Sequence, residues 1–134
     1  NICAGTLPVY YLFPNIIFMP TQEGAFLVQE YPLENSPHKS VSKISFYFYP
    51  HVLEHVKQLE KQGIDGKELL QQQYNGFASV IRDEDYVAAA SSHKGLKSGN
   101  IDYLTFGKNE PALHHYHNTY REALGLQSLP LEEA

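Results

Sequence analysis

The first residues whose side chains could take part in chemistry are acids at one end of an alanine-rich stretch. We predict a helix over residues 83–96, because Asp83 is a good N-cap and a Lys-Gly pair near residue 95 is typical of a helix end. With about 3.6 residues per turn, Asp85 then shares one face with the small residues Ala89 and Ser92. An acid on a small-residue face can point inward, whereas an acid in a first turn can also simply complement the helix dipole.

Two further groups of residues have spacings that suit a metal ion. His51 and His55 lie four apart on a predicted helix, so one ion can contact both side chains. Glu110, His114 and His117 follow spacings of four and three on the last predicted helix. For both groups, solvated or hydrogen-bonded side chains are the preferred interpretation, because such spacings are common on helix surfaces.

Four short motifs carry a resemblance to a known family. The first is Leu12-Phe13-Pro14-Asn15-Ile16, and the second is the acidic pair Glu84-Asp85 with a Gly-Leu about ten residues on. Gly107 with Glu110 and the His-His-Tyr-His run at 114–117 follow. In this order the motifs resemble those of Rieske-type non-haem iron oxygenase large subunits, in their C-terminal catalytic domain. His93 is a departure, because the family more often carries Gln at that position.

The resemblance implies a role for Asp85. In that family the second acid of the pair is the carboxylate ligand of a mononuclear iron(II), beside two histidines, and this ligand set leaves positions open for O₂ and substrate. The family's histidine pair precedes the Phe-Pro-Asn strand, and no His precedes Phe13 here. Its Rieske two-iron cluster needs two Cys and two His, so a chain with the single Cys3 cannot bind that cluster.

The elements expected to position these residues begin with strands. Residues 9–13 and 15–19 are β-rich on either side of Pro14, and residues 25–31 return as the second arm of a hairpin. Residues 32–39 are predicted to be a polar loop. Residues 40–49 alternate as a strand, with a slip near Lys43 that is typical of a β-bulge.

After Pro50 the spacing of apolar residues changes to the three- and four-residue spacing that is typical of helices. We predict helices over residues 51–62, 65–80, 83–96 and 110–124, with Gly63 ending the first. Residues 101–106 are expected to be a short strand or an irregular segment, and residues 126–134 a mostly disordered acidic tail. Strands followed by helices indicate an α+β domain spanning residues 1–134. The resemblance implies the helix-grip (START/Bet v 1-like) architecture, of which this chain supplies a part.

Composition excludes several function classes. A net charge of −5 and a pI near 5.7 argue against a nucleic-acid or anionic-membrane surface. No apolar run reaches the length of about 18 residues that spans a bilayer. The single Cys excludes an internal disulfide and fits a reducing compartment, so we expect a cytoplasmic location.

The resemblance implies an oxidoreductase of aromatic compound catabolism. The intact enzyme would take electrons through a reductase or ferredoxin and hydroxylate a small apolar or aromatic substrate, while the isolated chain would be inactive. The alternative is a non-catalytic helix-grip module that binds an apolar small molecule, lined by some of the ten Tyr and seven Phe. An incomplete sheet also predicts a homo-oligomer, because it leaves strand edges unpaired.

Overall fold

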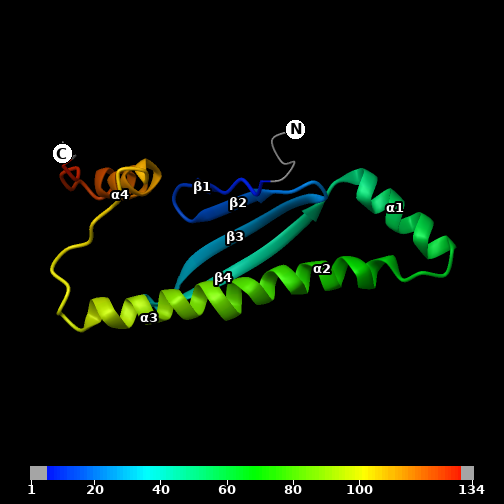
Figure 1. Cartoon of the computed structure of the whole chain (residues 1–134), viewed down its shortest axis with the longest axis horizontal. Helices are drawn as coiled ribbons and strands as arrows, with labels where there is room; N and C mark the ends of the chain where they lie inside the picture. Colours follow the sequence, from blue (N-terminus) through cyan, green and yellow to red (C-terminus); the bar gives the residue numbers. More distant parts are fainter. Residues whose placement is uncertain (1–5, 131–134) are drawn as a thin grey trace. The chain divides into compact units, whose positions relative to one another are not determined.

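The computed structural model describes residues 6–130, and it confirms an α+β chain in which a four-stranded antiparallel sheet precedes the helices (Figure 1). The strands are β1 (Tyr10–Leu12), β2 (Ile16–Pro20), β3 (Gly24–Leu33) and β4 (Ser36–Phe48). The helical elements are α1 (Pro50–Lys61), α2 (Gly66–Val80), the π-helical turn η1 (Ile81–Asp85), α3 (Tyr86–Lys97) and α4 (Pro111–Ala123). This arrangement is consistent with part of a helix-grip fold.

The sheet is a simple meander, because its spatial order β1-β2-β3-β4 is the order of the sequence. Pro14 follows a cis peptide bond and lies in the turn between β1 and β2, so it does not interrupt the ladder. The β2–β3 hairpin closes at the predicted turn, where the Thr21 hydroxyl accepts the backbone N–H of Gly24 at 3.1 Å. The strand and hairpin predictions for residues 9–31 are therefore confirmed.

The predicted loop over residues 32–39 is wrong. β3 runs on to Leu33 and β4 starts at Ser36, so only Glu34 and Asn35 form the turn. Both have positive φ, 56° and 51°, as a two-residue hairpin turn of the primed type requires. The predicted bulge at Lys43 is also wrong, because the register shift lies between Pro32 and Leu33. Long cross-strand pairing overrides the turn-forming composition here.

The first two helices start and end for local reasons. Gly63, with φ of 80°, ends the α1 region as predicted. Asp65 caps α2 through its side chain, which accepts the backbone N–H of Glu68 at 3.0 Å. The two helices meet closely at Gly66, where a Cβ atom would lie 2.8 Å from a methyl carbon of Val56.

The core lies between one face of the sheet and the helix that follows α1. Met19, Phe26 and Val28 from the sheet and Ile81 from η1 are its buried side chains. Half-buried residues of β4, α2 and α3 pack around them, among them Ile44, Phe46, Tyr74, Phe77 and Tyr86. The sheet contributes every second residue to this face, and the helix contributes positions spaced by three and four.

The separate helix predicted to begin at Asp83 is wrong. One helical rod runs from Gly66 through η1 to Lys97, and Asp83 lies inside it. No proline or glycine interrupts residues 77–94, and the packing of Phe77, Ile81 and Tyr86 on the same face of the sheet favours continuity. The far end lies at Lys97, with Gly99 rather than Gly95 in the left-handed conformation (φ 72°).

The chain consists of two compact units, Asn1–Ala89 and Ala90–Ala134. In the second unit, residues 101–106 form no strand. α4 matches the predicted last helix, with Glu110 at its N-cap and Gly125 in the left-handed conformation just after it. Residues 126–130 are irregular, and the rest of the predicted acidic tail lies outside the described residues.

Candidate functional site

The acidic pair Glu84-Asp85 lies in a turn of π-helix. The backbone N–H of Tyr86 donates to the carbonyl of Ile81, five residues back, where an α-helix would bond four residues back. The turn covers Ile81–Asp85 and joins α2 to α3 without a break. Such wide turns inside α-helices occur frequently at functional sites.

The extra residue decides which side chains face the sheet. The sheet-facing positions of α2 lead from Phe77 to Ile81, and a regular α-helix would continue them at Glu84 and Asp85. In the π-helical turn the next sheet-facing residue is instead Tyr86, which packs against the core. Asp85 is exposed, contrary to the expectation that it points inward.

A polar cluster holds Tyr86 on the sheet. Its hydroxyl donates to Oε1 of Glu30 on β3 at 3.1 Å, and the hydroxyl of Ser42 on β4 lies 2.6 Å from both oxygens of the same carboxylate. Glu30 and Ser42 are direct cross-strand partners. Two strands and the helical rod therefore meet at one carboxylate, which we call the Glu30 cluster (Glu30, Ser42 and Tyr86).

The environment of the Glu30 cluster favours the neutral form of the Tyr86 phenol. Partial burial raises the pKa of Tyr86 above its ordinary value, and the negative charges of Glu30 and Asp85 raise it further. The hydrogen bond with Ser42 acts in the opposite direction. Tyr86 is therefore a hydrogen-bond donor to Glu30 at neutral pH.

Asn15, within the Leu-Phe-Pro-Asn-Ile motif, supports the cluster from the turn just before β2. Its side-chain amide donates to the carbonyl of Glu30 at 2.8 Å, and the backbone N–H of Glu30 donates to the carbonyl of Asn15 at 3.0 Å. Sequence reasoning did not single out Glu30 or Tyr86. The available signal was a carboxylate in register with the apolar positions of Phe26 and Val28, since such a position requires a polar partner.

The other acids of the turn differ in their partners. Arg82 donates to the carboxylate of Asp83 at 2.7 and 2.8 Å, and this bond holds the pKa of Asp83 below its usual range. Within residues 6–130 the carboxylate of Asp85 forms no hydrogen bond or ion pair. Asp85 is thus an exposed carboxylate on the helical rod, and it directly precedes Tyr86, which anchors the rod on the sheet.

The histidine groups proposed from spacing do not form metal sites in the described residues. His51 and His55 are both exposed on α1. On α4, Glu110 accepts the backbone N–H of Gly107 at 2.6 Å, and His117 stacks on Phe106 with 5.0 Å between ring centroids. No three His, Cys, Asp or Glu side chains of residues 6–130 are grouped so that they could hold a metal ion.

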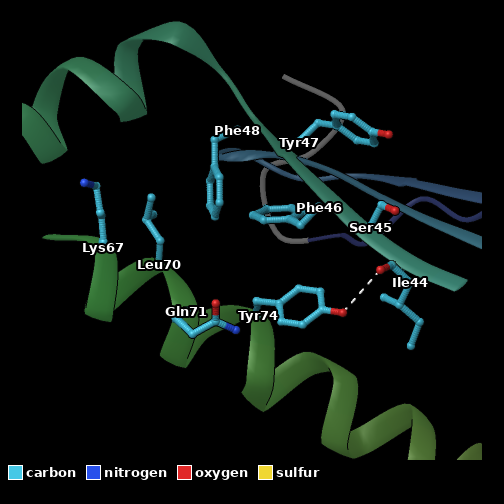
Figure 2. Close-up of a pocket in the computed structure, with 9 residues that line it drawn as sticks. All are labelled: Ile44, Ser45, Phe46, Tyr47, Phe48, Lys67, Leu70, Gln71 and Tyr74. Carbon is cyan, nitrogen blue, oxygen red and sulfur yellow. Dashed lines mark hydrogen bonds between the residues drawn. The ribbon is translucent and has the colours of Figure 1, made fainter.

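A groove of about 470 Å³ lies between β4 and α2 in the first unit. Figure 2 shows the rings of Phe46, Phe48 and Tyr74 and the side chain of Leu70 around it. The Tyr74 hydroxyl donates to the carbonyl of Ile44 at 3.2 Å and so bridges the helix and the strand. Ser45, Lys67 and Gln71 bring polar groups to a lining that is otherwise aromatic and aliphatic.

The sequence model of a protein family, the ring hydroxylating alpha subunit (catalytic domain), matches residues 4–126. The chain belongs to that family. The match covers the sheet, the helical rod and α4, so it includes the Glu30 cluster and the acidic pair. Neither a curated protein nor a solved structure matches the chain. Family membership confirms the resemblance drawn from the four motifs, and it identifies the chain with a family of iron-containing oxidoreductases.

The iron that the ring-hydroxylating family implies needs more ligands than residues 6–130 bring together. Asp85 is one exposed carboxylate, and it belongs to no group of three or more His, Cys, Asp or Glu side chains of the described residues that could hold an ion. The described residues therefore do not form a complete iron site. Among these residues, no helix has the length and apolar character needed to cross a membrane.

Proposed function

We propose that this chain is the C-terminal part of the catalytic domain of a cytoplasmic Rieske-type oxygenase, which hydroxylates an aromatic or other small organic substrate with O₂. The observation that carries the proposal is the family match over residues 4–126. In the intact enzyme, a reductase or ferredoxin and a Rieske cluster deliver electrons to a mononuclear iron(II). That cluster and the histidine ligands of the iron are supplied by residues outside this chain, because the sequence has only Cys3 and no His before Phe13.

Within this proposal Asp85 is the carboxylate ligand. The helical rod begins at Gly66 and Asp85 lies well inside it, which supports a ligand role over the alternative of an acid that complements the positive end of a helix dipole. The π-helical turn and the absence of a hydrogen-bond partner among the described residues both suit a carboxylate that is reserved for a metal.

The iron content of the gene product that carries this chain tests the assignment. We expect Asp85→Ala to abolish bound mononuclear iron, because a facial set of three ligands loses its only carboxylate. Asp83→Ala is the matched control, since that acid lies in the same turn and already pairs with Arg82. Metal analysis of both purified variants is the measurement. Equal iron content in wild type and Asp85→Ala would remove Asp85 from the ligand set.

The role of Asp85 can also be tested without iron, through the unfolding free energy of the chain. We expect Asp85→Asn to leave the unfolding free energy unchanged or to raise it slightly, because the exposed Asp85 carboxylate has no hydrogen bond or ion pair among the described residues to lose. Thermal melts at low and high salt measure this. A loss of about 0.3–1 kcal/mol that salt screens would indicate the dipole role instead.

The purified 134-residue chain is expected to be inactive as an oxygenase. It has a single Cys, whereas a Rieske cluster needs two, and its described residues do not form a complete iron site. O₂ uptake with reductase and NADH, measured with and without naphthalene as substrate, should not differ from a reaction without protein. Substrate-dependent uptake would contradict this expectation.

The second candidate function is the binding of an apolar small molecule without iron. The groove beside Phe46, Phe48 and Leu70 favours it, because aromatic and aliphatic walls with a few polar groups are typical of ligand sites. An iron-free gene product in which 1-naphthol shifts the NMR signals of Leu70 and Tyr74 would support this function. Iron bound through Asp85 would instead support the oxygenase.

We also propose that the chain forms a homo-oligomer. Among the described residues, β1 and β4 each pair with one neighbour only, so both edges of the sheet keep unpaired backbone groups. The face of the sheet opposite the core carries exposed Tyr10, Leu12 and Tyr47. Light scattering of the purified chain should give a mass of at least two copies, and a monomer at micromolar to millimolar concentration would contradict this.

A further inference from the structure

We propose that Tyr86 and Glu30 are positioning residues: their hydrogen bond keeps the helical rod in its π-helical register and thereby sets the direction of Asp85. The inference rests on the proposed function, because the direction of Asp85 matters when it is a ligand. It adds a role for two residues that do not themselves contact the metal.

The rod has two possible registers at this point. If the helix stayed regular after Ile81, the residue four positions on would face the sheet, and that residue is Asp85. Asp85 would then hold the sheet-facing position of the helix that Tyr86 holds, and a second negative charge would be directed towards Glu30 in place of a hydrogen-bond donor. With one extra residue in the turn, a neutral phenol faces Glu30 and the acid is turned out to solvent.

Four contacts hold the observed register. Ile81 is buried in the core at the start of the turn. At its end, the Tyr86 ring packs against the same core and its hydroxyl donates to Glu30. Ser42 fixes the accepting carboxylate from the neighbouring strand. Contacts with the sheet therefore hold both ends of the turn, Ile81 and Tyr86. These contacts set the directions of the acids between them.

Spin labels on the chain test the register directly. With Cys3→Ser as background, one label is placed at Glu84→Cys in the turn and the other at Lys43→Cys, an exposed position on β4. We expect Tyr86→Phe and Glu30→Ala each to shift or broaden the distance distribution between the labels. Glu30→Gln should restore the wild-type distribution, because its amide oxygen still accepts the Tyr86 hydroxyl.

The matched control moves the helix label to Val80→Cys, an exposed site just before the turn. That distribution should not change in any variant, because α2 keeps its own packing. Circular dichroism shows whether each variant is folded, and Ser42→Ala serves as a milder variant if Glu30→Ala is not. Unchanged label distances at Glu84→Cys in folded Tyr86→Phe and Glu30→Ala would overturn the inference.

Iron retention separates this inference from the proposed function. In the gene product we expect Tyr86→Phe to weaken iron binding by about 10-fold or more, the usual effect of removing a group that orients a ligand, and Glu30→Gln to retain it. If the label distances change but Asp85→Ala does not affect iron, the register inference stands and the ligand assignment fails. If Asp85→Ala abolishes iron while Tyr86→Phe changes neither distance nor affinity, the positioning role fails alone.

Discussion

Phe26→Ala is expected to lower the unfolding free energy by about 3–5 kcal/mol, the range for removing a buried aromatic ring. Only 4% of Phe26 is exposed, and its ring stacks between Phe46 of β4 and Phe77 of α2, with centroids 4.0 and 3.7 Å away. The substitution therefore removes the middle of a three-ring stack that joins the sheet to the helical rod. Both remaining rings would face the resulting cavity, because neighbouring side chains relax only partially.

Urea unfolding followed by circular dichroism measures this loss. Tyr47→Ala is the matched control, because Tyr47 lies on the opposite face of the same sheet and 61% of it is exposed. We expect the control to change the unfolding free energy by less than about 1 kcal/mol. Similar losses in both variants would mean that the stack is not the main contact between sheet and helix.

Gly24→Ala should destabilise the chain by about 3 kcal/mol, at the upper end of the usual cost of overpacking, although it adds a single methyl group. Gly24 is buried at the start of β3, opposite Phe48. A Cβ atom there would lie 1.9 Å from the carbonyl oxygen of Tyr47. Because that oxygen belongs to the backbone of the paired strand, relief requires the two strands to separate locally.

Gly76→Ala makes the same chemical change as Gly24→Ala, but we expect it to raise the unfolding free energy. Gly76 lies within α2, and no heavy atom outside its own helix backbone lies within 4 Å of the position of its Cβ. We expect a gain of about 0.5–1 kcal/mol, because alanine restricts the unfolded chain and favours the helix. The denaturation midpoints of Gly24→Ala and Gly76→Ala, compared with that of the wild type, measure both changes in stability. Equal effects would show that the close approach at Gly24 does not constrain the strands.

Much of the architecture could be predicted from local patterns. The hairpin at Thr21–Gly24, the cap at Asp65 and the end of α1 at Gly63 are each specified by a few neighbouring residues. The turn at Glu34 and Asn35 could not be predicted in the same way, because its flanks contain Pro32 and Pro37 and look like a loop. There the tertiary pairing of β3 with β4 outweighs local preference.

The site was predictable only in part. The motif identified the acidic pair, but the N-cap rule placed a helix start at Asp83, since an acid inside a helix and an acid at its beginning have the same local sequence. The π-helical turn depends on what faces the sheet at Tyr86, and that contact joins residues 56 positions apart. Pattern reasoning over a window of a few residues does not reach such a pair.

The meander has a consequence for synthesis on the ribosome. All four strands are complete at Phe48, whereas Tyr86, the last residue of the helical rod that packs on the core face of the sheet, is 86 − 48 = 38 residues later. At about 5–20 residues per second, the face bearing Met19, Phe26 and Val28 waits roughly 2–8 s for its cover. We therefore expect the nascent sheet to present an apolar face that chaperones can bind, and slow translation of α2 to prolong that exposure.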